Sequence, residues 1–198
     1  LTKRGEISGK AGHGLYIPSL QGIKSERVCV IGCGKKGKRL PKEKILEVLK
    51  KFVDASKSCK AASTVLVIPS LKPEGEDESW VMQQLGTLAE SSMYVYETKL
   101  GKKDTIKHKL KRISISFDTK ESEQILKKKL KIGQVVGQGS NEAKSLANLP
   151  GNICTPSYIA KASRRITKKY SSLSCRVLGE REMRKMGMDC LLSVGTGS

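Results

Sequence analysis

Short apolar runs alternate with amphipathic stretches through the first part of this chain, and this order constrains the fold more than any other feature. The apolar runs are rich in β-branched residues, and two of them end at glycine or proline, which predicts buried strands. The stretches between them carry apolar residues at helical spacing, which predicts helices. Together they predict an α/β fold. We expect strands at 27–31, 64–68 and 113–117, and helices at 41–56 and from Trp80 onward.

The first predicted helix shows this pattern clearly. Pro41 stands where the first turn of a helix tolerates proline, because the missing N–H would have no partner there in any case. The acidic stretch 72–78 contains glycine and predicts a loop before the next helix. The apolar residues that recur at helical spacing after Pro41 are Ile45, Leu46, Leu49, Phe52 and Val53.

A long apolar stripe begins after Glu121 and continues to Leu149. It predicts one long helix, interrupted near Gly137 and Gly139 because glycine weakens a helix interior. Two strand-like apolar runs follow, and they lack sheet partners, so we expect aggregation or local disorder in this last part of the chain. The elements expected there are helices at 157–170 and 180–185 and strands at 174–178 and 190–194.

The most specific motifs lie near the end of the chain. Residues 148–156 read Asn-Leu-Pro-Gly-Asn-Ile-Cys-Thr-Pro, where two prolines fix φ and two asparagines can bond neighbouring backbone groups. By itself this pattern predicts a helix end, an ordered turn and a helix started by proline. Met186-Gly187-Met188 follows, and then residues 193–198 read Ser-Val-Gly-Thr-Gly-Ser, a glycine loop after the second strand-like run.

These motifs resemble the leucyl aminopeptidases, also called the cytosol aminopeptidase family, and especially their bacterial members. Arg4-Gly5-Glu6, Gly9-Lys10 and the run from Ser25 to Lys35 resemble the front domain of the same family. The resemblance implies three parts: an N-terminal three-layer α/β domain over 1–120, a long linker helix over 121–147, and the incomplete start of an α/β peptidase domain over 148–198.

The resemblance also implies a function for the complete protein. Members of this family hydrolyse N-terminal residues from peptides with two divalent metal ions, manganese or zinc, and assemble as homohexamers. The lysine, aspartates, glutamate and arginine that do this chemistry in the family lie beyond Ser198. We therefore predict no catalytic, cofactor-binding or metal-ligating residue within these 198 residues, no bound metal, and no peptidase activity of this chain by itself.

The net charge of +19 and the pI near 9.8 leave three interpretations open. Clustered lysines can form a surface that binds nucleic acid phosphates. The lysines can also simply lie on solvated helix faces. A third interpretation is that acidic residues balance their charge in the part of the family's chain that is absent here. The alternative function is a basic DNA-binding module, alone or as a second role of the aminopeptidase, because some bacterial relatives bind DNA. The clusters lie at 35–36, 107–112, 127–129 and 164–169.

A glycine-rich run from Gly32 to Arg39 partly matches two phosphate-binding patterns. Read as Gly-x-Gly-x-x-Gly, the run should lead directly into a helix N-terminus that binds the phosphate, but the predicted helix begins only after Pro41. A dinucleotide-binding fold also has an acidic residue at the end of its second strand, and the second predicted strand here does not end in one. As a P-loop it has Arg39 where a hydroxyl must bind magnesium. We therefore favour a tight turn with solvated lysines.

Other chemical groups are isolated in the sequence. His13 and His108 lack carboxylates or cysteines at ligand spacing, no Gly-x-Ser-x-Gly elbow is present, and Asp104, Asp118 and Asp189 stand apart, as helix caps or loop residues do. We interpret the six cysteines as reduced thiols. Cys29 and Cys33 lack the two further ligands that a structural zinc site needs.

The location of the protein follows from what the sequence lacks. No run approaches the roughly 20 apolar residues of a membrane span, and the first residues are not followed by the apolar core of a signal peptide. We therefore expect a cytoplasmic protein without membrane contact. Leu1 in place of methionine suggests that further sequence precedes this chain.

Overall fold

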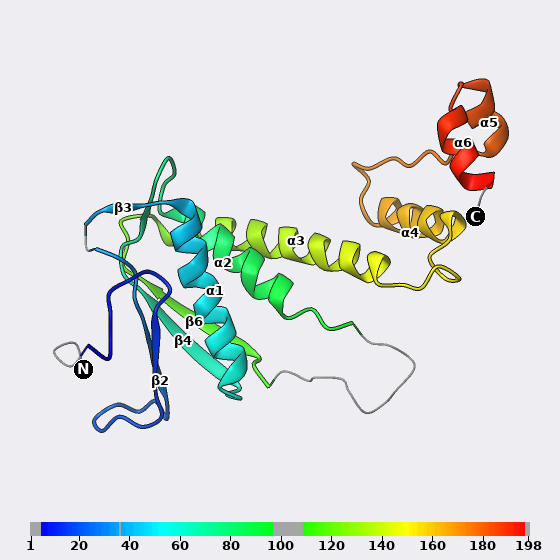
Figure 1. The fold of residues 1–198 in the computed structure, drawn as a ribbon. Coiled ribbons are helices and arrows are strands. Elements are labelled where there is room, and N and C mark those ends of the chain that lie inside the picture. The colour runs from blue at the N-terminus through cyan, green and yellow to red at the C-terminus, as the bar shows by residue number, and fades with distance from the viewer. Residues whose placement is uncertain (1–4, 36, 97–108, 197–198) are drawn as a thin grey trace. The chain divides into compact units, whose positions relative to one another are not determined.

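The computed structural model describes residues 5–35, 37–96 and 109–196. The chain divides into two compact units, an N-terminal unit at 1–144 and a C-terminal unit at 145–198 (Figure 1). The predicted mixed α/β fold is confirmed in the N-terminal unit, which carries all strands among the described residues. No helix among those residues is both long and apolar enough to cross a membrane.

In the described part of the N-terminal unit, the β structure consists of three short sheets of two strands each. The predicted strands are confirmed as β2 (Val28–Ile31), β4 (Ser63–Ile68) and β6 (Arg112–Phe117). The other three strands, β1 (Gly14–Ile17), β3 (Arg39–Leu40) and β5 (Lys72–Pro73), were not predicted, because runs of two to four residues are too short to show alternation. β1 pairs antiparallel with β2, while β3 pairs with β5 and β4 with β6 in parallel.

The sheet of β4 and β6 has one covered face and one open face. On the covered face Leu66 lies opposite Ile115 in the register, and both pack against the hydrophobic core. On the other face the side chains of Val65 and Val67 are 67% and 72% exposed. Since successive side chains of a strand point to opposite faces, only every second residue of β4 contributes to the core.

Helices α1 (Lys42–Ser58) and α2 (Ser79–Ser92) pack on the covered face of the sheet of β4 and β6 (Figure 1). The predicted apolar stripe of α1 is confirmed, except that Leu46 is only half-buried. Burial of these side chains is the main stabilising term of the unit, at about 25 cal/mol for each Å² of apolar surface removed from water. The buried core residues are Ile45, Leu49, Phe52, Val53, Ile68, Leu71, Val81 and Leu85.

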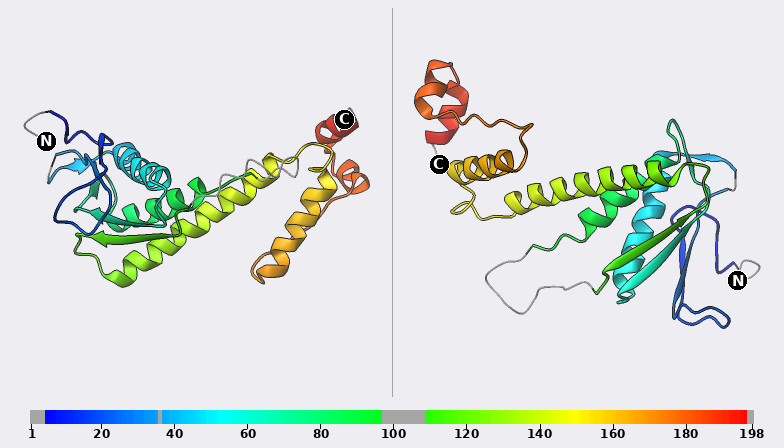
Figure 2. Two further views of the ribbon diagram at one scale, coloured as in Figure 1. Left: turned by 90° about the horizontal axis from the view of Figure 1, so that it is seen from below. Right: turned by 180° about the vertical axis from the view of Figure 1, so that it is seen from behind.

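The long helix α3 (Glu123–Ala147) packs on α2 through glycines, and the two run side by side in both views of Figure 2. A Cβ built on Gly133 would lie 1.9 Å from the Gln83 carbonyl oxygen of α2. A Cβ on Gly137 would lie 2.9 Å from the carbonyl oxygen of Thr87. The predicted interruption near Gly137 and Gly139 is wrong, because α3 is continuous and Gly137 serves as a close contact point between helices.

The first turn of α2 is held by the Asp77 carboxylate. Its Oδ1 accepts hydrogen bonds from the Ser79 hydroxyl and from the Trp80 backbone N–H, at 3.2 Å for the latter. The hydrogen bond from Ser79 is the main cause that lowers the pKa of Asp77 below its ordinary value. A charged carboxylate at this position also stabilises the N-terminal end of the helix dipole.

The C-terminal unit is helical where it is regular, with α4 (Pro156–Lys169), α5 (Glu180–Lys185) and α6 (Asp189–Thr196). Two helices confirm the predictions for 157–170 and 180–185. The strands predicted at 174–178 and 190–194 are wrong, because the first run has no regular structure and the second lies inside α6. A strand needs a neighbour for its hydrogen bonds, whereas a helix satisfies them internally. The expected unpaired strand edges are therefore not present at 190–194.

Candidate functional site

The segment 148–156 forms the turn that its prolines and asparagines predict. The N–H of Ile153 and the N–H of Cys154 both donate to the Pro150 carbonyl oxygen at 2.9 Å. Thr155 is the N-cap of α4, and its hydroxyl accepts a hydrogen bond from the Tyr158 N–H at 3.3 Å. Since Pro156 then opens the helix, the motif has the structural role that the sequence indicated: it ends one helix and starts the next.

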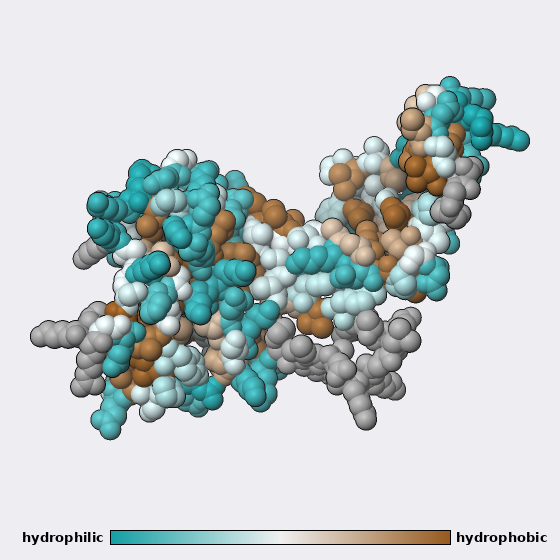
Figure 3. Space-filling view, viewed as in Figure 1, coloured by the Kyte–Doolittle hydropathy of each residue, from teal (hydrophilic) through white to brown (hydrophobic). Residues whose placement is uncertain are grey.

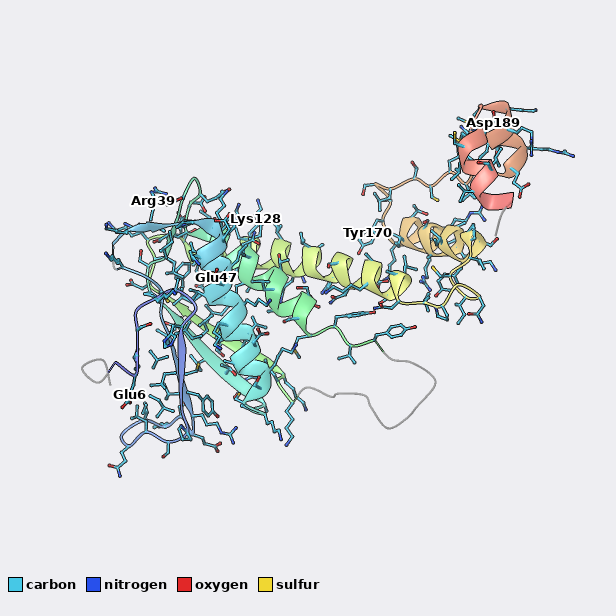
Figure 4. All side chains as sticks on the ribbon, viewed as in Figure 1. Glu6, Arg39, Glu47, Lys128, Tyr170 and Asp189 are labelled. Atoms are coloured by element: carbon cyan, nitrogen blue, oxygen red, sulfur yellow. The ribbon has the colours of Figure 1, made fainter. Side chains whose placement is uncertain are left out.

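The glycine-rich run after β2 does not place a helix N-terminus beside its glycines. Gly34 and Gly37 adopt positive φ values of 84° and 77°, as turns require, while α1 begins only at Lys42. The Arg39 guanidinium, labelled in Figure 4, donates a 2.7 Å hydrogen bond to the Pro73 carbonyl oxygen and so ties β3 to β5. Lys36 lies outside the described residues. This arrangement lacks the dipole that phosphate-binding loops use.

Among the described residues, the titratable groups singled out in the sequence do not come together. His13 is exposed beside β1, Asp118 follows β6, and Asp189 lies at the start of α6 (Figure 4). His108 and Asp104 lie outside the described residues. Within the described part of the chain, no group of three or more histidine, cysteine, aspartate or glutamate side chains is placed to hold a metal ion.

The cysteines of the described residues are free thiols. Burial raises the pKa of Cys33, which is half-buried against the core. Burial also raises the pKa of Cys29, and the nearby Lys51 ammonium opposes that shift. A raised pKa keeps both thiols protonated at neutral pH, which disfavours a role as nucleophile.

A groove of about 1030 Å³ lies between β2 and β4 in the N-terminal unit, and residues of α1 also line it. Its walls are largely apolar, and hydrophobic side chains reach the surface beside the strands of this unit (Figure 3). The hydroxyls of Ser56 and Thr64 are buried in its lining without a hydrogen-bond partner. The sequence did not predict this groove, because it depends on which strand edges stay unpaired.

A basic stripe runs along α4 in the C-terminal unit. Its spacing of three and four residues places Lys161, Arg164, Arg165 and Lys168 on one side of the helix, and all four are exposed. The cations of the last turn also stabilise the C-terminal end of the helix dipole. None of the ion pairs found among the described residues involves this stripe.

Comparison with known proteins assigns the family. Residues 1–103 match the sequence profile of the cytosol aminopeptidase family, N-terminal domain, and residues 141–198 match that of its catalytic domain. These profiles describe a class of metal-dependent peptidases. The chain belongs to the cytosol aminopeptidase family.

Individual relatives agree with this assignment. A probable cytosol aminopeptidase of Nitrosococcus oceani is 35% identical over 198 residues, and a cytosol aminopeptidase of Vibrio cholerae is 29% identical over the same length. Each alignment covers 100% of this chain and 39% of the relative. The chain therefore spans well under half the length of these relatives.

Solved structures share the fold. A tomato leucine aminopeptidase mutant superposes with a TM-score of 0.68 at 18% identity, over 94% of this chain and 35% of the other. The bottromycin maturation enzyme BotP in complex with Mn gives a TM-score of 0.67 at 17% identity, over 94% of this chain and 36% of the other. At these identities the likeness establishes the architecture alone.

Proposed function

We propose that these residues are the front part of an aminopeptidase that removes N-terminal residues, leucine among them, from peptides. The observation that carries this proposal is the order of the two profile matches, with the N-terminal domain at 1–103 followed by the catalytic domain at 141–198. We further propose that the complete enzyme uses two divalent metal ions, manganese or zinc, and that it is a cytoplasmic homohexamer. The Mn-bound BotP structure supports the metal part of it.

We propose that the catalytic and metal-binding residues of the enzyme lie in the part of the protein that these 198 residues do not include. The described residues offer no set of metal ligands, and the chain covers 39% of its relatives. We propose that residues 1–120 form the N-terminal domain, that 121–147 link it to the peptidase domain, and that 148–198 begin that domain. The turn at 148–156 then sets where the peptidase domain starts.

Two expression products test this proposal. We expect the purified 198-residue chain to release no leucine from leucine amide with Mn²⁺ or Zn²⁺ present. We expect the complete reading frame to release it and to lose that activity when EDTA removes the metal. Circular dichroism of the shorter chain controls for unfolding. Chelator-sensitive hydrolysis by the shorter chain would contradict the assignment of catalysis to the rest of the protein.

DNA binding is a second candidate function, and the basic stripe of α4 is the observation that favours it. Four exposed cations on one side of a helix can contact successive phosphates, and each contact releases counterions. The formal net charge of +19 adds long-range attraction to any polyanion. Sequence preference requires side chains that hydrogen-bond to the edges of the bases, and the proposed contacts are to phosphates alone. We therefore expect DNA binding without sequence preference.

Charge reversal on α4 tests the second function. With a duplex of about 30 base pairs followed by fluorescence anisotropy, Arg164→Glu, Arg165→Glu and Lys168→Glu together should lower the salt slope by about three, or about one for each lost phosphate contact. The matched control reverses three exposed lysines outside the lysine clusters, at Lys24, Lys50 and Lys120. Equal losses in both variants, or no binding by the unmodified chain at low salt, would rule out a phosphate-binding stripe on α4.

A further inference from the structure

The groove between β2 and β4 runs along the edges of both strands. Its lining includes every residue of β2 and the consecutive residues 63–68 of β4. Since successive side chains of a strand point to opposite faces, a hollow that touches consecutive residues lies beside the strand's edge and not over one face. Two strand edges therefore border one hollow.

The hydrogen bonds of β4 show which of its backbone groups point into the groove. The Ile68 carbonyl oxygen accepts a 2.9 Å hydrogen bond from the Asp118 N–H just after β6. Backbone groups of successive residues alternate between the two sides of a strand. Val65 and Val67 therefore direct their N–H and C=O groups away from β6 and toward the groove.

The same alternation applies to β2. The Gly32 N–H donates a 2.7 Å hydrogen bond to the His13 carbonyl oxygen, on the side where β1 lies. Cys29 and Ile31 therefore direct their backbone groups away from β1. The Cys33 thiol donates a weak 3.5 Å hydrogen bond to the Ile31 carbonyl oxygen, which otherwise has no strand partner among the described residues.

Both strands start at the same end of the groove. The Arg27 guanidinium, just before β2, donates a hydrogen bond to the carbonyl oxygen of Cys59, a few residues before β4. Helix α1 connects the two strands, and such a β-α-β unit normally places its strands in one sheet. Here a hollow of about 1030 Å³ separates the edges, whereas paired strands lie only about 4.8 Å apart.

We propose that the groove holds one further β-strand, supplied by the part of the same polypeptide that these residues do not include. The chain covers only 39% of the length of its relatives, so ample sequence is available to supply it. Free backbone groups on both sides select an extended main chain over a compact ligand. The apolar walls and α1 select a strand with apolar side chains on its inner face.

The inserted strand also accounts for two costs in the structure. Ser56 Oγ and Thr64 Oγ1 are buried in the groove lining without partners, and a buried hydroxyl left unpaired is unfavourable. Two unpaired strand edges with exposed valines promote aggregation. A central strand would remove both edges at once and join β1, β2, β4 and β6 into one sheet.

Hydrogen exchange with added peptides tests the inserted strand. In the 198-residue chain we expect fast exchange at the amides of Cys29, Ile31, Val65 and Val67, and slow exchange at Leu66. The probes are overlapping peptides of about 12 residues that tile the Nitrosococcus oceani relative outside its aligned part. One overlapping group should bind and slow exchange at all four amides. Slow exchange without peptide, caused by direct pairing of β2 with β4 or by a second copy, would overturn the proposal, as would the absence of a binding peptide.

A matched pair of variants separates main-chain pairing from side-chain contact. Val67→Pro removes an N–H that points into the groove and leaves the ladder to β6 intact, so circular dichroism should be unchanged. We expect it to weaken binding of the selected peptide by about tenfold or more, while Val67→Ala stays within about threefold. Equal effects of the two variants would contradict pairing through the backbone. Aminopeptidase activity is not part of this readout, so the result is independent of the proposed function.

Discussion

Replacing Gly133 by alanine is expected to destabilise the N-terminal unit by about 3 kcal/mol or more, at the upper end of what overpacking costs. A Cβ at this position would lie 1.9 Å from the Gln83 carbonyl oxygen and 3.0 Å from the Thr87 backbone nitrogen. Both atoms belong to the backbone of α2, so no side-chain rotation can relieve the overlap. The helices must separate, which opens the contact between α2 and α3. Urea unfolding followed by circular dichroism measures the loss as a lower midpoint at unchanged slope.

Gly139→Ala in the same helix is the matched control and should have the opposite sign. No atom lies within 4 Å of a Cβ built on Gly139, and the residue is exposed. Alanine should therefore stabilise α3 by about 0.5–1 kcal/mol, because glycine in a helix interior costs conformational entropy. If both variants shifted the unfolding midpoint in the same direction, the close approach of α2 and α3 would be contradicted.

The two glycines also show where local sequence patterns lose their power. A glycine pair inside an apolar stripe predicted a break in the helix, yet Gly137 lies against α2 and Gly139 lies in the open. The same residue type thus has two different roles, and only the neighbouring helix distinguishes them. Patterns that depend on one element alone were more reliable: the helical spacing of α1 correctly predicted its buried face, from Ile45 to Val53.

Strand assignments depended on the availability of partners. Thr64 to Ile68 and Ile113 to Phe117 were predicted as strands and pair with each other in β4 and β6. The apolar run 190–194 has a similar composition but lies in α6. A short apolar run does not distinguish a strand from a buried helix by periodicity. Hydrogen-bond partners from elsewhere decide it, and the described part of the C-terminal unit contains no strand.

Functional information in the sequence was of two kinds. The motifs at 148–156 and 186–198 led to the family through resemblance, and the profile matches confirm that assignment. In the structure the first of these motifs forms a turn and a helix cap, with Thr155 as the N-cap of α4. The groove between β2 and β4 had no signal in the sequence. It arises because, in the part of the chain that the structure describes, the facing edges of β2 and β4 have no strand partner.

Replacing Ile45 by alanine is expected to cost about 2–5 kcal/mol of stability, the range for a buried aliphatic side chain cut back to its Cβ. Ile45 is 0% exposed and belongs to the core between α1, α2 and β4. Its removal deletes apolar contacts and leaves a cavity whose walls are fixed by three elements. With so small a core, a loss of this size is a large share of the few kcal/mol that hold such a unit together.

Ile125→Ala on α3 deletes the same atoms from a side chain that is 45% exposed. The loss there should stay below about 1 kcal/mol, because water already covers much of the side chain and no closed cavity forms. Thermal unfolding of both variants under one set of conditions compares them, and Ile45→Ala should show the lower midpoint by several degrees. Equal midpoints would mean that α1 does not pack on the sheet as described. A larger loss for Ile125→Ala would show instead that a partner covers this face of α3 and that the helix is buried in the complete protein.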